Sequence, residues 1–194
     1  NGTTWNQWSL SDIGSPLSQD DARPEFYDIG YDSEGNFWGC TYYGVVYRDA
    51  QGTWHSIEET EGLYTYAMTI DPFDNVWVAD RGDNFLYQIT TDGFVTHDAN
   101  TIPPLANAIN DLASDQYGHL YCAMDGGGIL EIFPGLGKTN NTAALSYKEY
   151  TNANTGGGIP DDNLSQLEIL NDDIWFSSPA GITRVTNLVR LSTE

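Results

Sequence analysis

A strand, a tight turn and a second strand are predicted by the stretch Ile70-Asp71-Pro72-Phe73-Asp74-Asn75-Val76-Trp77-Val78-Ala79-Asp80. Asp71 opens the turn and is placed to accept hydrogen bonds from the turn amides, while Asn75 tolerates the left-handed backbone of a tight hairpin. A further turn leads to a third strand, Asn84-Phe85-Leu86-Tyr87-Gln88-Ile89. Imperfect copies of this pattern recur along the chain, so the fold follows from the repetition.

The repeat is measured most clearly from the large aromatic residue of each second strand. These residues, which we call the ruler aromatics, are Trp38, Trp77, Tyr121 and Trp175, separated by 39, 44 and 54 residues. An aspartate stands six residues before each of the first three, whereas Ile169 takes this place in the fourth copy. We expect all four ruler aromatics to lie in the core.

Each copy has room for four strands. The inner strands are apolar at nearly every position and the outer strands alternate, as expected for sheets that pack face to face around an axis. Helical periodicity is absent. Repeats of about 40 to 50 residues with four strands predict an all-β fold, the β-propeller, as one domain over residues 1–194. The predicted blades cover residues 24–57, 64–97, 107–150 and 162–191. A β-sandwich is the rival, but it would not repeat one turn motif at regular spacing.

The first residues of the chain form no part of these four units. Residues 5–10 (Trp5-Asn6-Gln7-Trp8-Ser9-Leu10) predict a spare outer strand, although the fourth unit is expected to have its own, through Leu191. We therefore expect a segment of a larger propeller, or a subunit that completes a ring with copies of itself. A closed four-bladed ring with a spare strand is the alternative.

Charge restricts the classes of partner. Aspartate and glutamate outnumber lysine and arginine by 28 to 7, and the net charge of −21 disfavours nucleic acid and anionic membrane surfaces. No apolar run approaches the roughly 18 residues that a membrane helix needs, so membrane insertion is not expected. Low lysine content and abundant asparagine, glycine and aromatic residues are typical of exported proteins, which predicts an extracytoplasmic location. Cys40 and Cys122 belong to different units, so no disulfide is predicted between them.

The copies resemble the two-component-regulator propeller repeat, whose signature runs D-x-x-G-N-[LI]-W-[VI]-G-T and then G-[LI]. The stretches that match are Asp32 to Thr41, Gly44-Val45 and Ala180-Gly181-Ile182. The Asp71 copy is more similar to blades of the NHL and streptogramin-lyase type. The resemblance covers nearly the whole chain, but its motifs specify blade geometry. It implies a propeller that senses or binds ligands outside the cytoplasm, often glycans, with lyases and lactonases among a few relatives.

In a propeller the turns after the first strands lie on one side of the ring, the turn face. The loops after the second strands and those entering each unit lie on the other side, the loop face. The candidate ligand-binding residues there are Tyr42, Tyr43, Tyr64, Arg81, Asp83, Asn110 and Asp125. Aromatic faces cover the C–H faces of a sugar ring while amides and carboxylates bind its hydroxyls, so a glycan site is one hypothesis. The alternative is that these tyrosines fill gaps between blades.

Metal and catalytic signals are weak. No calcium loop of the Asp-x-Asp-x-Asp-Gly type occurs, and turn capping explains acidic pairs such as Asp71 and Asp74 as well as Ca²⁺ would. No metal site and no cofactor is therefore assigned. His55 and His97 lie on predicted outer strands and His119 on the turn face, which disfavours a lyase mechanism. The sequence favours a non-catalytic sensor-type propeller that binds a glycan or another protein. A structural segment that assembles with other chains is the first alternative, and a lyase- or lactonase-like enzyme is the second.

Overall fold

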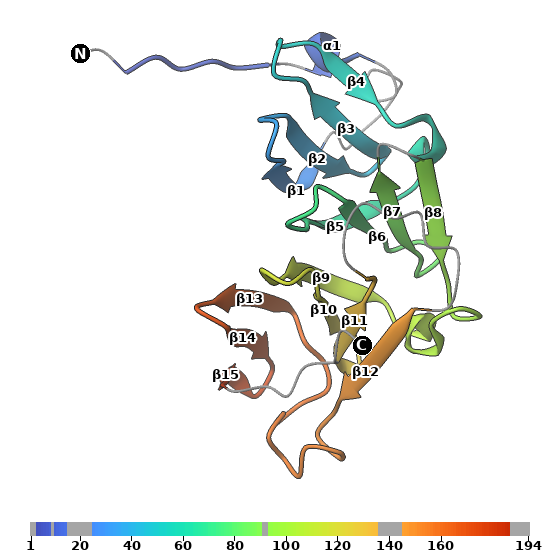
Figure 1. The fold of residues 1–194 in the computed structure, drawn as a ribbon, viewed down its shortest axis with the longest axis vertical. Helices are drawn as coiled ribbons and strands as arrows, with labels where there is room; N and C mark the ends of the chain where they lie inside the picture. The colour runs from blue at the N-terminus through green and yellow to red at the C-terminus, as the bar shows by residue number, and fades with distance from the viewer. Residues whose placement is uncertain (1–2, 9, 15–24, 91–92, 136–144, 187–194) are drawn as a thin grey trace.

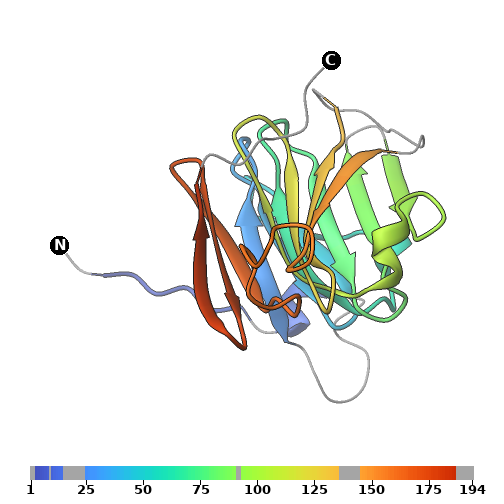
Figure 2. The same ribbon diagram turned by 90° about the horizontal axis from the view of Figure 1, so that it is seen from below.

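Four antiparallel sheets fan out as the blades of a β-propeller, in an arc around a common axis (Figure 1). This computed structural model describes residues 3–8, 10–14, 25–90, 93–135 and 145–186. The prediction of an all-β propeller is confirmed. Figure 2 shows the same sheets from below, with their faces turned toward one another.

The strands follow one another along the chain and within each sheet. Blade 1 contains β1 (Phe26–Tyr31), β2 (Phe37–Thr41), β3 (Gly44–Arg48) and β4 (Trp54–Ser56). Blade 2 contains β5 (Thr65–Ile70), β6 (Val76–Asp80), β7 (Leu86–Thr90) and β8 (Gly93–His97). Blade 3 contains β9 (Ile109–Ser114), β10 (Leu120–Met124), β11 (Gly128–Phe133) and β12 (Ser146–Tyr150). Blade 4 contains β13 (Gln166–Leu170), β14 (Asp173–Ser178) and β15 (Gly181–Val185). Its expected outer strand, Leu188 to Leu191, lies outside the described residues.

Helical turns are short and lie at the ends of blades. Among the described residues they are α1 (Leu10–Ile13) and two 3₁₀ turns, η1 (Glu58–Thr60) and η2 (Pro103–Ala106). Among the described residues, no helix is long and apolar enough to cross a membrane.

In blades 1 and 2 the repeated aspartate holds the first turn and connects it to the ruler tryptophan. In blade 2, Asp71 Oδ1 accepts hydrogen bonds from the amides of Phe73 (2.9 Å) and Asn75 (3.0 Å). Its Oδ2 accepts from Asn75 Nδ2 (2.7 Å) and from Trp77 Nε1 (3.0 Å). In blades 1 and 2 the spacing of six residues between aspartate and tryptophan therefore lets the indole N–H reach the turn carboxylate.

The core consists of apolar layers between consecutive blades. One layer, with Cys40, Met68 and Val78, separates blades 1 and 2. The next contains Trp77, Leu112 and Cys122, between blades 2 and 3, and a third with Tyr121 and Phe176 lies between blades 3 and 4. Each of the described sheets thus gains stability mainly by covering its neighbour, as expected for radially repeated sheets.

Two sequence expectations are wrong. Residues 3–8 form no strand and Leu10–Ile13 is helical, so the spare outer strand of residues 5–10 is absent from the described residues. An outer strand requires the free edge of a third strand, and in blades 1, 2 and 3 this edge is already paired with the fourth strand of the same blade. The ruler aromatics are also not all in the core: Trp77 and Tyr121 are fully buried, whereas Trp38 is half-buried and Trp175 is 38% exposed.

Candidate functional site on the loop face

Five tyrosines gather where blades 1 and 2 meet on the loop face, and we call them the tyrosine cluster. They are Tyr27, Tyr42, Tyr43, Tyr64 and Tyr66. Ring centroids of Tyr42 and Tyr64 lie 4.9 Å apart, and the Tyr27 ring lies 5.4 Å from Tyr64 and 5.2 Å from Tyr66. The tilted and edge-on angles are those that aromatic pairs prefer.

Short loops fix the positions of these rings. Tyr42 and Tyr43 form the two-residue turn between β2 and β3, where Thr41 Oγ1 accepts a hydrogen bond from the Tyr43 amide (3.1 Å) and donates to the Gly44 carbonyl (2.8 Å). The amide of Arg81 donates to the carbonyl of Tyr64 (2.9 Å), which joins the loop after β6 to the loop entering β5. The cluster is therefore attached to strand ends, which gives its rings defined positions.

Arg81 extends the cluster with a positive charge. Its guanidinium carbon lies 4.3 Å from the centroid of the Tyr66 ring, a cation–π contact. Tyr42 is 36% exposed, and Tyr27, Tyr64, Tyr66 and Arg81 are half-buried. The cluster thus offers both aromatic faces and a hydrogen-bonding rim to solvent.

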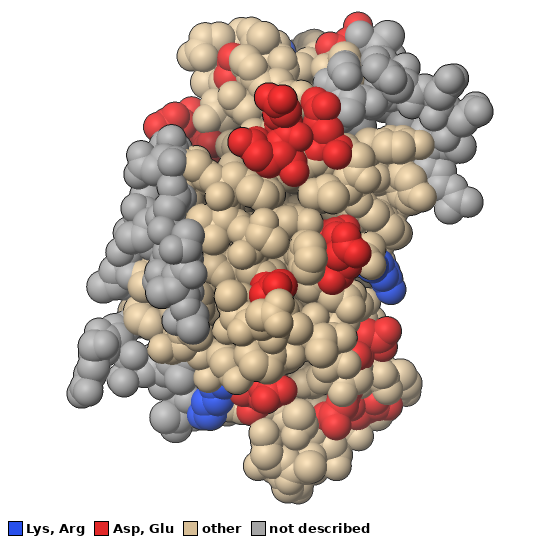
Figure 3. All heavy atoms as spheres, turned by 90° about the vertical axis from the view of Figure 1, so that its right-hand side faces the viewer, with Lys and Arg blue, Asp and Glu red and all other residues tan. Residues whose placement is uncertain are grey.

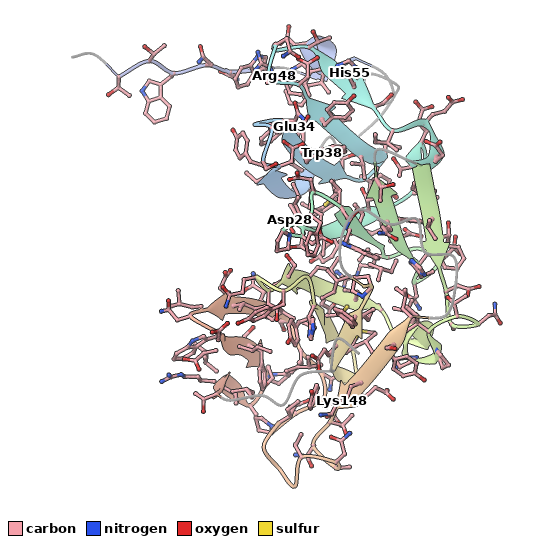
Figure 4. The ribbon with its side chains drawn as sticks, viewed as in Figure 1. Asp28, Glu34, Trp38, Arg48, His55 and Lys148 are labelled. Atoms are coloured by element: carbon pink, nitrogen blue, oxygen red, sulfur yellow. The ribbon has the colours of Figure 1, made fainter. Side chains whose placement is uncertain are left out.

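A groove of about 560 Å³, the channel groove, runs along the first strands of all four blades beneath this cluster. Tyr27 and Tyr66 belong both to the cluster and to the lining of the groove, so the cluster lies at its mouth. Polar side chains from blades 1, 3 and 4 complete the lining: Asp28, Asn110, Asp111, Gln166 and Glu168. Figure 4 places Asp28 on this concave side and His55 at the outer strand of blade 1.

Asp28 and Asp111 occupy equivalent places in blades 1 and 3 and connect each blade to the next. Asp28 Oδ2 accepts a hydrogen bond from the Met68 amide of β5 (3.0 Å), and Asp111 Oδ2 accepts one from the Leu167 amide of β13 (2.8 Å). Each carboxylate also accepts the amide of the residue that follows it. The two side chains therefore fix the relative positions of neighbouring first strands.

Burial raises the pKa of both carboxyl groups. For Asp28, desolvation outweighs the lowering effect of the Met68 and Ile29 amides. For Asp111, desolvation again dominates, and the negative charges of Asp28 and Glu168 raise the pKa further. At the mouth of the groove, burial and the neighbouring Tyr64 and Glu25 raise the pKa of Tyr27, so its hydroxyl stays protonated and can donate.

The structure brings together four of the seven residues that the sequence indicates. Tyr42, Tyr43, Tyr64 and Arg81 lie in or against the tyrosine cluster. Asn110 lies in the channel groove, where its Nδ2 donates to the Leu164 carbonyl (2.8 Å) and its Oδ1 has no hydrogen-bond partner among the described residues.

Asp83 and Asp125 lie apart from this site. Asp83 is exposed in the turn between β6 and β7, where its amide donates to Asp80 Oδ2 (3.1 Å). Asp125 is exposed and forms an isolated bridge with Asn163, beside blade 4. Neither residue lines the groove.

None of the histidines and cysteines lines the groove. His55 stacks on Tyr47 in blade 1, and His97 is buried against Trp77, where desolvation lowers its pKa. His119 is buried, with Nδ1 2.9 Å from Glu131 Oε1. Cys40 and Cys122 are buried free thiols in different core layers. Within the described ranges, no group of three or more potential protein ligands is arranged to hold a metal ion.

Asp28 and Asp111 are the site residues that the sequence interpretation missed. Each stands four residues before the turn aspartate of its blade, at Asp32 and Asp115. A carboxylate inside a first strand that is otherwise apolar or small is the signal that would have identified them.

Comparison with solved structures supports the fold. A streptogramin B lyase matches with a TM-score of 0.64 and 22% identity over 92% of this chain and 58% of that one. The extracellular domain of the hybrid two-component system BT3049 from B. thetaiotaomicron matches with a TM-score of 0.62 and 19% identity. The match covers 82% of this chain and 21% of that one. A third match is a catalytically inactive histidine-to-alanine variant of virginiamycin B lyase from Staphylococcus aureus, with quinupristin. Its TM-score is 0.59 and its identity 19%, over 84% of this chain and 56% of that one.

The chain therefore spans less than two thirds of these proteins. No protein-family model matches the sequence, and no curated relative matches it. Because the identities are below 25%, the likeness concerns the fold. Among the similar folds are both extracellular sensor domains and enzymes, including a gluconolactonase from Xanthomonas campestris.

Proposed function

We propose that this chain is a non-catalytic, ligand-binding propeller of the sensor type, located outside the cytoplasm, whose ligand is a glycan bound at the tyrosine cluster. The observation that carries the proposal is the position of the cluster: half-exposed tyrosine rings and Arg81 surround the mouth of a polar groove. The rings can cover the C–H faces of a sugar, and the groove offers carboxylate, amide and hydroxyl groups to its hydroxyls.

Charge narrows the class of glycan. Asp28, Asp111 and Glu168 line the groove, and the outer side of the molecule carries many more acidic than basic side chains (Figure 3). A sulfated or uronic-acid glycan would meet electrostatic repulsion in this groove. We therefore infer that the preferred ligand is a neutral or amino sugar.

The placement of histidine supports a non-catalytic role. None of His55, His97 and His119 lines the channel groove. A histidine-to-alanine variant of the similar virginiamycin B lyase is catalytically inactive. The sensor-domain neighbours support the extracytoplasmic location.

A glycan array that contains neutral, amino and acidic glycans tests the proposal. We expect binding to neutral or amino glycans, a loss of at least about tenfold in Tyr42→Ala and Tyr64→Ala, and no change in Tyr117→Ala. Tyr117 is the matched control because it is 48% exposed but lies in the turn between β9 and β10, on the turn face. Absence of binding to every glycan would contradict the proposal and leave a protein as the remaining class of ligand.

A further inference from the structure

The ruler aromatic of blade 4 lacks the cover that its equivalents have. Trp77 and Tyr121 are fully buried because each packs on the next blade along the arc. Trp175 takes the equivalent position in blade 4, where it pairs with Glu168 of the first strand, but its side chain is 38% exposed. Leu170 and Ile182 beside it are 59% and 78% exposed. This free face of blade 4 therefore has the composition of an interface between blades.

Blade 1 lacks cover on the opposite side. Ile29 is 59% exposed, whereas Met68 and Leu112 at the same register in blades 2 and 3 are 4% and 5% exposed. They are buried because the preceding blade covers them. Tyr31, on the same strand as Ile29, is 69% exposed. Blade 1 therefore presents the surface that normally receives a ruler aromatic.

The outer part of the free face of blade 1 is only partly covered. Ile13 of α1 packs with Val46, and the Trp8 ring lies 6.3 Å from the ring of Trp54. A mostly apolar pocket of about 290 Å³ remains beside them. The buried Nε of Arg48 and Nε1 of Trp54 in its lining have no hydrogen-bond partner among the described residues. Such groups are costly unless a partner satisfies them.

The two free faces fit each other. One presents a ruler aromatic and the other presents the surface that receives it, which is the contact made three times within the arc. On the face of blade 4, Arg184 lies over the Trp175 ring and is paired with Asp173. This leaves the exposed Glu168 as the unpaired charge among the described residues there. Its sign is opposite to that of Arg48 on the face of blade 1. Figure 1 shows blades 1 and 4 separated at the open side of the arc, so they cannot cover each other within one molecule.

We propose that a second copy of this chain covers both faces, with blade 4 of each copy packed on blade 1 of the other. Each contact joins unlike faces of the two copies, and in the closed pair that we propose the two contacts are related by a two-fold axis along the channel. The ring then has eight blades, four from each chain. The channel groove becomes enclosed by first strands from both copies.

Light scattering after size-exclusion chromatography tests this arrangement. We expect twice the chain mass of 21.4 kDa, with association strengthened by salt because each copy carries a net charge of −21. Trp175→Glu and Ile29→Glu should each give a monomer with unchanged far-ultraviolet circular dichroism. Tyr117→Glu, an exposed tyrosine on neither face, should remain dimeric.

A mixing experiment distinguishes a heterologous contact from other dimers. Trp175→Glu leaves the face of blade 1 intact and Ile29→Glu leaves that of blade 4 intact, so their mixture should recover one contact and form a heterodimer. Neither variant should form a dimer alone. A chain that stays monomeric at every protein and salt concentration would overturn the proposal, as would a dimer that both variants leave unchanged.

Discussion

At the scale of single residues, two aspartates only four residues apart, Asp28 and Asp32, have different roles. Asp32 lies in a first turn, where burial opposes but hydrogen bonds from Trp38, Asn36 and Glu34 lower its pKa. Asp28, four residues earlier, lies in the channel groove, and desolvation raises its pKa. Asp32 stabilises a hairpin, whereas Asp28 connects two blades at the cost of a partly desolvated carboxylate. Residue type alone does not distinguish them.

The titration of these carboxyl groups follows from their surroundings. Since the folded-state pKa of Asp28 and Asp111 is raised, the folded protein binds their protons more tightly than the unfolded chain does. Their contribution to stability is therefore greatest at low pH and is lost as the pH rises through the folded pKa values. Carboxyl ¹³C NMR should give midpoints above the ordinary aspartate value of about 3.9 for both groups and below it for Asp32. Midpoints in the reverse order would show that the hydrogen bonds outweigh desolvation in the groove.

At the scale of the strand, the glycines that begin β3 and β15 have the same backbone conformation but different surroundings. Gly44 and Gly181 both have a φ of +121°, a conformation that side chains rarely adopt. A Cβ at Gly44 would lie 2.5 Å from the Thr60 carbonyl oxygen, whereas a Cβ at Gly181 would meet nothing within 4 Å. The first glycine allows a close approach of backbones in addition to its unusual dihedral angle.

These two glycines form a matched pair for mutation. Gly44→Ala and Gly181→Ala incur similar backbone strain, but only the first adds a steric clash, so we expect it to lose about 1–3 kcal/mol more of the free energy of unfolding. Urea denaturation of the two variants measures the difference. Equal losses would mean that the η1 turn moves away without cost.

At the scale of the whole molecule, the sequence predicted the propeller and much of the candidate site. The repeat predicted the sheets because each hairpin depends on local contacts, such as that between Asp71 and Trp77. It also placed Tyr42, Tyr43, Tyr64 and Arg81 on one face. These residues cluster because the loops that carry them lie on the same side of neighbouring blades. The repeat predicts the order of strands and therefore the side on which each loop lies.

What the sequence did not predict depends on contacts between blades. Asp28 was missed because its partner, the Met68 amide, lies 40 residues away in the next blade. Trp175 was expected in the core because its sequence motif is that of a buried aromatic, yet its burial depends on a neighbouring sheet. The N-terminal strand was expected from its own composition, but a strand also needs a free edge to pair with.

The loop-face site is the central claim, and the footprint of a bound glycan tests it most directly. Hydrogen–deuterium exchange with and without the best glycan of the array should show protection in residues 42–44 and 64–66. The turn of residues 115–119 on the opposite face should exchange at the same rate in both states. Protection confined to that turn, or to the outer strands, would contradict the assignment of the ligand to the tyrosine cluster.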